Sequence, residues 1–183
     1  MTHIGGGASR PHAPMLWTRP PDPPDPATLA PRRLLLASEG RRFPADAVDF
    51  AARLAARTGA PVHVLSIARI WGTALGFPNP NLYPSKQEWD QQRDLVSEAV
   101  RLLEGRGLKA TGQVIGTRGA ARRIVAVARQ TGCDAIVTAA EPPRNWLVAD
   151  FLWTQEPYRV RRRAKVPVYL VPVGEATLAG GAS

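Results

Sequence analysis

The chain has 183 residues, a formal net charge of +9 at neutral pH and a hydrophobic fraction of 44%. This length is enough to bury one substantial core, and the hydrophobic fraction excludes a chain that is disordered throughout. The basic balance permits a polyanionic partner, but the abundance of arginine along the whole chain explains it as well. Cys133 is the only cysteine, so an intramolecular disulfide is excluded, and it is predicted to be a small buried filler.

The sequence predicts one folded domain with a tail at each end. Residues 1–31 hold eight of the eighteen prolines and are expected to be disordered, because proline-rich polar sequence buries too little apolar area. Residues 174–183 are small and are expected to fray, which leaves 32–173 as the domain. No apolar run reaches the roughly 20 residues of a membrane-spanning helix. The first ten residues lack the apolar part of a secretory signal, so a cytoplasmic protein without a membrane partner is expected.

The first half of the domain reads as strand, helix, strand. Arg33 to Gly40 is a short apolar run typical of a buried parallel strand, with Glu39 at its carboxyl end. Pro44 begins a helix with one apolar face, and Gly59 ends it. Pro61 to Ile67 is the second strand.

The second half continues the alternation after a long connection, Arg69 to Pro84, whose aromatics either cover a site or pack on the sheet edge or a second subunit. Ser85 with Glu88 matches the capping box that opens a helix. The elements that follow are a weaker edge strand (Lys109 to Ile115), a helix after Gly119, a strand (Cys133 to Ala140) and a last strand (Val166 to Val171). This alternation predicts a three-layer α/β domain with a parallel sheet.

Four stretches, in this order, resemble the universal stress protein family. They are RLLLASEG (33–40), LAARTGAPVHVLSI (54–67), GTRGAARRIVAVARQTGCDAIVTAA (116–140) and RRRAKVPVYLVP (161–172). The resemblance implies a five-stranded parallel sheet in the order 3-2-1-4-5, of the Rossmann-like, adenine-nucleotide alpha-hydrolase-like type. It also implies a homodimer that pairs through the last strand.

Some members of that family bind ATP through an aspartate after the first strand and a loop of the form Gly-two-Gly-nine-Gly-Ser/Thr after the fourth. At the matching positions this chain has Glu39 and then Glu141, Arg144, Thr154 and Gln155, with no glycine in the loop. Such glycines let backbone amides approach phosphates closely. The resemblance therefore implies the fold without ATP as a cofactor. Glu39, Arg144 and Thr154 remain the candidate nucleotide-binding residues.

Two functions follow from this resemblance. The first is a non-catalytic stress-response or regulatory protein that acts through dimerisation and partner binding. The second is a sensor of ATP or AMP with a rewired phosphate loop, in which Arg144 and Arg118 meet the phosphates. The candidate interface residues are aromatic: Trp146, Phe151, Trp153 and Tyr169. The alternative is that the segment from Trp146 to Trp153 fills the cleft in which other members of the family hold the nucleotide.

Other function classes find less support in the sequence. The basic run from Arg159 to Lys165 would spread its charges around a helix axis, so a solvated helix end is expected rather than a nucleic-acid site. No metal-ligand cluster is evident. No spacing of Ser, His and Asp indicates catalysis, and His63 is the single histidine outside the predicted tails. The sequence therefore predicts neither an enzyme nor a metal site.

Overall fold

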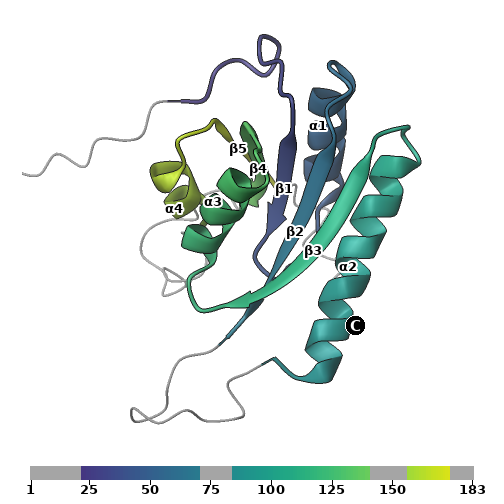
Figure 1. Cartoon of the computed structure of the whole chain (residues 1–183), viewed down its shortest axis with the longest axis vertical. Helices are drawn as coiled ribbons and strands as arrows, with labels where there is room; N and C mark the ends of the chain where they lie inside the picture. The colour runs from purple at the N-terminus through teal and green to yellow at the C-terminus, as the bar shows by residue number, and fades with distance from the viewer. Residues whose placement is uncertain (1–21, 71–83, 141–155, 174–183) are drawn as a thin grey trace, which may run out of the picture.

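The computed structural model describes residues 22–70, 84–140 and 156–173. Strands and helices alternate along them (Figure 1): β1 (Leu34–Ser38), α1 (Ala45–Ala56), β2 (Val62–Arg69), α2 (Lys86–Glu104), β3 (Ala110–Thr117), α3 (Ala120–Gln130), β4 (Ala135–Ala140), α4 (Glu156–Arg163) and β5 (Val168–Pro172). The strands pair in parallel in the order β3-β2-β1-β4-β5. This confirms the predicted α/β fold and strand order. No helix in the described ranges is long and apolar enough to cross a membrane.

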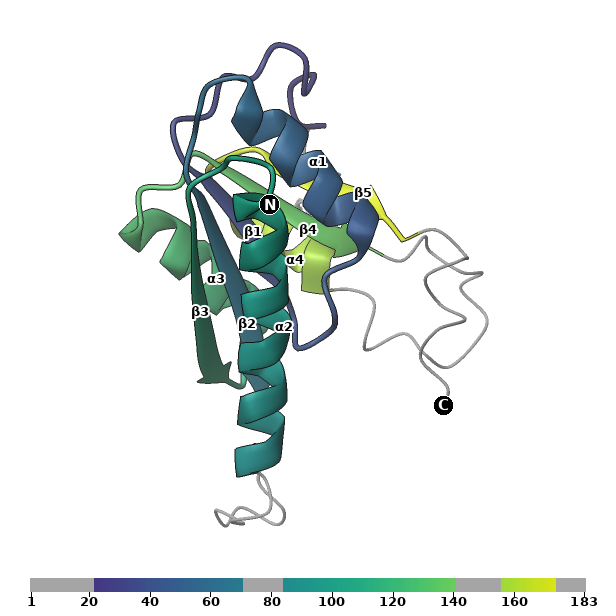
Figure 2. The same cartoon turned by 90° about the vertical axis from the view of Figure 1, so that its right-hand side faces the viewer.

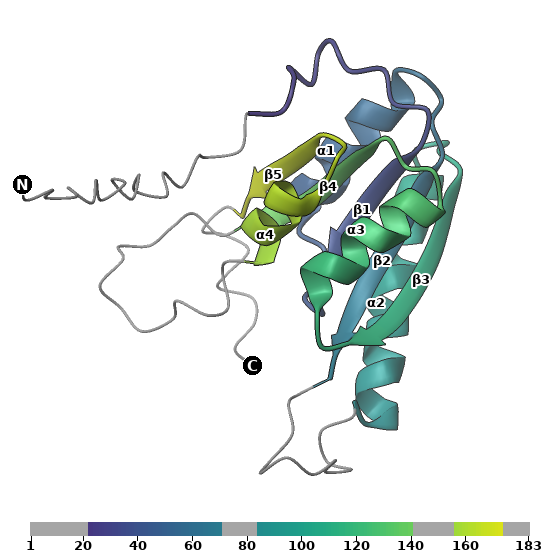
Figure 3. The same cartoon turned by 60° about the vertical axis from the view of Figure 1, so that its left-hand side comes forward.

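The sheet is covered on both faces. Helices α1 and α2 lie on one face (Figure 2), and α3 and α4 lie on the other (Figure 3). Successive residues of a strand point to opposite faces, so Leu34 and Leu36 join the core under α1 and α2, whereas Leu35 and Ala37 join the core under α3 and α4. None of the four is more than 2% exposed. Burial on both sides explains why β1 reads as an unbroken apolar run.

Local signals in the sequence also have the expected structures. The backbone N–H of Ser85 donates to the Glu88 carboxylate at 2.6 Å, and the N–H of Glu88 donates to Ser85 Oγ at 3.2 Å, which confirms the capping box. Strand β3 is an edge strand, as predicted. A Cβ at its Gly112 would lie 2.4 Å from a methyl group of Val96, so glycine lets α2 lie close to the sheet. Cys133 is buried as predicted, and this burial raises the pKa of its thiol.

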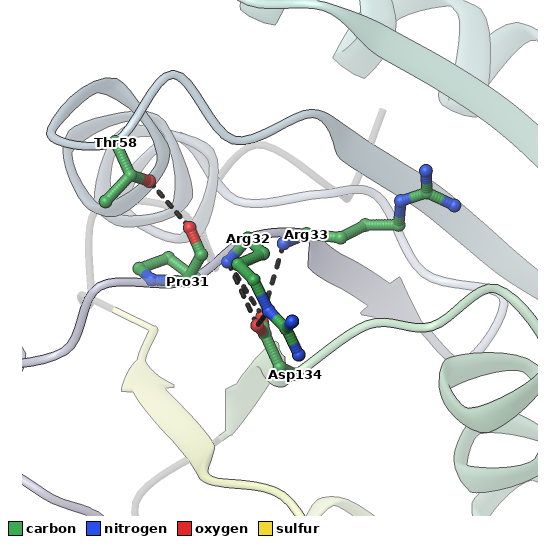
Figure 4. Close-up of polar contacts among 5 residues, drawn as sticks. All are labelled: Pro31, Arg32, Arg33, Thr58 and Asp134. Atoms are coloured by element: carbon green, nitrogen blue, oxygen red, sulfur yellow. Dashed lines mark hydrogen bonds and ion pairs between the residues drawn. The ribbon is translucent and has the colours of Figure 1, made fainter.

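The amino end of the sheet is held by Asp134, which directly precedes β4 (Figure 4). Its carboxylate accepts hydrogen bonds from the backbone N–H of Arg32, at 3.0 and 3.1 Å, and from that of Arg33, at 3.2 Å. The N–H of Asp134 donates in return to the carbonyl oxygen of Arg33 at 3.0 Å. This exchange fixes the start of β1 against the start of β4, and thereby the register of the two central strands.

These bonds decide the charge state of Asp134. Burial by itself would raise the pKa of the carboxyl group, but the hydrogen bonds from Arg32 and Arg33 outweigh it, so the pKa lies below its ordinary value. A carboxyl group with a depressed pKa in the folded state stabilises the fold above its unfolded pKa. That stabilisation is lost as the pH falls through the folded pKa.

Residues 22–31, which we call the strap, lie against the domain, whereas the sequence analysis placed them in a disordered tail and began the domain at residue 32. The Arg161 guanidinium pairs with Asp22 at 2.6 Å, and the Tyr169 hydroxyl donates to the carbonyl oxygen of Pro24 at 3.0 Å. Beyond these contacts, Arg57 donates to Pro26 at 2.7 Å and also to Ala27. The strap therefore contacts α4, β5 and the end of α1 in turn.

The composition argument missed the strap for a physical reason. Proline removes backbone donors but leaves every carbonyl oxygen as an acceptor. The donors come from side chains of the domain, including Thr58, whose hydroxyl donates to Pro31 at 2.7 Å (Figure 4). Leu29 adds apolar contact with the core under α1 and α2.

Replacing Asp134 with Asn should lower the melting temperature at neutral pH, because the charged acceptor for the Arg32 and Arg33 amides is lost. The gap between wild type and D134N should persist above about pH 5 and close as the pH falls below about 4, where the wild-type carboxylate takes up its proton. Thermal unfolding followed by circular dichroism across this range measures the gap. A gap that stays constant at all these pH values would contradict the account.

Removing the strap should destabilise the domain. A chain that begins at Arg32 should melt a few degrees below one that begins at Asp22, because Tyr169, Arg57 and Thr58 lose their carbonyl partners. Calorimetry of the two truncated chains side by side makes the comparison. Equal melting temperatures would show that the strap contacts do not contribute.

Candidate functional site

The candidate site lies at the carboxyl ends of β1 and β4. In a parallel α/β sheet this edge carries the ligand crevice at the point where the strand order reverses. Here the chain leaves β1 toward β2 on one side, whereas β4 lies on the other side of β1. The N-termini of α3 and α4 lie at the same edge, because each helix follows a strand that ends there. Helix N-termini carry partial positive charge and favour anions.

The turn after β1 is tightly built. Ser38 Oγ accepts a hydrogen bond from the N–H of Arg41 at 3.2 Å and donates to its carbonyl oxygen at 2.5 Å. Gly40 has φ +83°, and a Cβ there would lie 2.9 Å from the carbonyl oxygen of Ile67 in β2. The positive φ and the close approach both require glycine. The turn thus packs directly against the end of the neighbouring strand.

Gln92 of α2 connects this turn to β2. Its amide nitrogen donates to the carbonyl oxygen of Gly40 at 3.0 Å, and its amide oxygen accepts from Ser66 Oγ at 2.6 Å. Gln92 is 8% exposed and Ser66 is fully buried. Sequence reasoning missed Gln92. The available signal was a polar residue one turn before Val96 on the apolar face of α2.

Glu39 lies where the sequence predicted it, between β1 and Gly40. The residue is half-buried, and one of its carboxylate oxygens is shielded from solvent. It stands at the carboxyl end of a central strand, next to the turn at Gly40. Of Glu39, Arg144 and Thr154, only Glu39 lies among the described residues. Arg118, which was also predicted to meet phosphates, is exposed just before the N-terminus of α3.

Glu156, the first residue of α4, supplies an anion at the N-terminus of α3. Its carboxylate accepts from the backbone N–H of Ala121 at 3.1 Å and from the Arg159 guanidinium at 2.6 Å. The Glu156 side chain is 15% exposed. One amide of the first turn of α3, a position that favours anions, is therefore already occupied by a carboxylate of the protein. The sequence showed Glu156 only as an acid at a helix start, and its partner on another helix was not evident.

The other predicted site residues fall into two groups. Five of them, which the sequence assigned to the phosphate loop and the interface, lie outside the described residues: Arg144, Trp146, Phe151, Thr154 and Trp153. Tyr169, the remaining interface candidate, is only 4% exposed. Its ring lies 5.4 Å from the ring of Phe50, and the strap covers its hydroxyl. In this conformation Tyr169 offers no ring surface to a partner, and its predicted interface role stays a prediction.

The described residues give no geometry for catalysis. His63 Nδ1 lies 2.9 Å from Thr111 Oγ1, and Nε2 lies 3.3 Å from Gln113 Oε1, so both ring nitrogens contact polar side chains of β3. This pairing links two strands and includes no carboxylate. Over the ranges that the structure covers, no three His, Cys, Asp or Glu side chains gather as metal ligands.

Comparison with solved structures places the fold among universal stress proteins. One from Burkholderia pseudomallei is 21% identical over 77% of this chain and 96% of its own, with a TM-score of 0.57. One from Archaeoglobus fulgidus, in complex with dAMP, is 17% identical over 80% of this chain and 100% of its own, with a TM-score of 0.56. A third, in complex with cAMP, is 18% identical over the same shares, with a TM-score of 0.58.

Identities this low establish the fold alone. Comparison with curated proteins gave no match. The model of the universal stress protein family matches residues 31–172, which is most of the chain and includes every described strand and helix. The chain therefore belongs to the universal stress protein family.

Proposed function

We propose that this protein is a non-catalytic stress-response or regulatory member of its family, which acts through dimerisation and partner binding and does not use ATP. The observation that carries this proposal is the Glu156 carboxylate on the Ala121 amide. A triphosphate that approached the N-terminus of α3 would have to displace a carboxylate that Arg159 also holds. Breaking the hydrogen bonds of the carboxylate would cost free energy, and repulsion between the phosphate and the displaced carboxylate would add to that cost.

The packing around Gly40 supports the same proposal. Ser66 donates a hydrogen bond to Gln92, and Gln92 donates one to the carbonyl oxygen of Gly40. These buried groups therefore have hydrogen-bond partners without a ligand. A complete internal network lets the fold form with this edge empty. The loop composition adds to this argument, since no glycine stands at the family's phosphate-binding positions from Glu141 to Gln155.

Dimerisation through β5 is the partner mode that the fold favours. Among the described strands β5 pairs with β4 alone, so its other edge carries unpaired backbone groups. Leu170 and Val171 are half-buried and Pro172 is exposed, whereas Val168 and Tyr169 at the start of the strand are buried. A second copy would therefore meet the later part of β5.

A second candidate function is a nucleotide sensor with a rewired site. Two structures of similar fold are complexes with cAMP and dAMP, which carry a single phosphate. Glu39 stands at the carboxyl end of β1, and a carboxylate there can accept from ribose hydroxyls. A monophosphate at the β1 turn would need fewer hydrogen bonds from the N-terminus of α3 than a triphosphate would.

Purified wild-type protein should release no adenine nucleotide when it is denatured, and calorimetric titration with ATP should give no saturable heat. Titration with AMP and cAMP in the same experiment separates the two candidate functions. If AMP or cAMP binds and Glu39→Gln removes that binding, the sensor replaces the non-binding scaffold. Saturable binding of ATP by the wild type would contradict the primary proposal.

Replacing Leu170 with Glu should shift the protein from dimer to monomer in sedimentation velocity, because it places a charge beside the open edge of β5. The matched control is Leu102→Glu, since Leu102 is an exposed leucine of α2, on the opposite face of the sheet from α4. The control should sediment as the wild type does. Equal effects of the two variants, or a wild type that is monomeric at all concentrations, would argue against dimerisation through β5.

A further inference from the structure

The two helical layers of the fold differ sharply in charge. Helices α1 and α2 together carry seven acidic and four basic side chains, a net charge of −3. Helices α3 and α4 carry one acidic and seven basic side chains, a net charge of +6. We call α3 and α4, with the flanking Arg118 and Lys165, the basic layer. Between the two helical layers, the excess of positive charge thus lies on α3 and α4.

An abundance of arginine does not explain this difference. Arginines beside α1 and α2 meet carboxylates: Arg42 pairs with Glu98 at 2.6 Å, and Arg106 pairs with Asp49. Two arginines of α4 also have carboxylate partners, since Arg159 pairs with Glu156 and Arg161 pairs with Asp22 of the strap. The difference lies in the number of acids: α3 has none and α4 has only Glu156, whereas α1 and α2 together have seven, and a bias toward arginine does not produce this deficit.

Most cations of the basic layer are exposed. Helices α3 and α4 pack against each other (Figure 3), so their outer faces form one surface. On α4, Pro157 and Val160 are buried, so the side of the helix that carries them faces the domain. The exposed cations are Arg118, Arg122, Arg129, Arg162, Arg163 and Lys165. The charges of α4 alone would spread around its axis, as the sequence predicted. Together, the adjacent helices α3 and α4 present their charges on a common surface.

The composition of this surface distinguishes between classes of polyanion. Protein interfaces have an apolar centre, and helices that lie on membranes insert apolar side chains. Among the described residues, Leu102 and Tyr158 are the exposed large hydrophobic side chains, and only Tyr158, 38% exposed on α4, belongs to the basic layer. Nucleic-acid interfaces are polar and strongly positive, arginine binds phosphate through its planar fork, and an aromatic ring can stack on a base.

We propose that the basic layer binds nucleic acid through its phosphate backbone, without reading the sequence. The proposal does not depend on dimerisation, because β5 does not contribute to the basic layer. The layer shares Arg118 and the N-termini of α3 and α4 with the candidate nucleotide site, so the test variants lie within α3, at Arg122 and Arg129. Binding driven by phosphate contacts should fall steeply with salt. It should also depend on where the positive charges are, and not only on how many there are.

Fluorescence anisotropy with a labelled mixed-sequence DNA of about 20 nucleotides, single-stranded and duplex, tests this on the full chain. The test variant is Arg122→Glu with Arg129→Glu on α3. The matched control is Arg53→Glu with Arg101→Glu, exposed arginines of α1 and α2 that give the same change in net charge. The test variant should bind at least about tenfold more weakly than the wild type, and the control should stay within about threefold. Wild-type affinity should drop between about 50 and 200 mM salt.

Melting temperatures of all variants show whether they fold, and Arg122→Gln with Arg129→Gln replaces the test pair if the glutamates prevent folding. Equal losses in the test and control variants would overturn the proposal, because net charge alone would then explain binding. No binding by the wild type at low salt would also overturn it. So would binding to polyglutamate or to phosphatidylserine vesicles as tight as that to DNA, which would assign the layer to an acidic protein or a membrane.

Discussion

The exchange of hydrogen bonds between Asp134 and the chain just before β1 is the constraint on which the rest of the structure depends. It joins the starts of the two central strands, which are more than a hundred residues apart in the sequence. With that register set, Leu34 and Leu36 point to one layer of helices and Leu35 and Ala37 to the other, with almost no exposed surface. The same register brings the ends of β1 and β4 together at the opposite edge of the sheet, where open α/β sheets carry their ligands.

That edge, in this chain, is occupied by the chain's own polar groups. Gln92 joins the Gly40 turn to Ser66, and Glu156 binds the N-terminus of α3. Gln92 supplies hydrogen bonds to the Gly40 turn and to β2, and Glu156 supplies negative charge to the N-terminus of α3. Glu156, the one acid of α4, is used at this site, and α3 has no acid of its own. In the functions that we propose, Glu156 thus takes part both in the exclusion of ATP and in the basic character of α3 and α4.

The sequence was informative wherever a structure depends on neighbouring residues. The apolar run of β1, the capping box of Ser85 and Glu88, and the edge strand with Gly112 all follow from local pattern. It was uninformative wherever the partner is distant in sequence. Composition marked the strap as a tail, because its prolines lack donors and the donors that hold it, Arg57, Thr58 and Tyr169, are supplied by the domain. Gln92, Asp134 and Glu156 were missed for the same reason, since each acts on a backbone group of another element.

Solution NMR of the Ala121 amide tests the central claim most directly. If the Glu156 carboxylate holds that N–H, its chemical shift should move in Glu156→Gln and should not move when millimolar ATP and Mg²⁺ are added to the wild type. The amide of Gly40, in the turn after β1, serves as a second reporter. A saturable shift of both amides with ATP in the wild type would show that nucleotide displaces the carboxylate, and would contradict the account of a crevice filled by the protein itself.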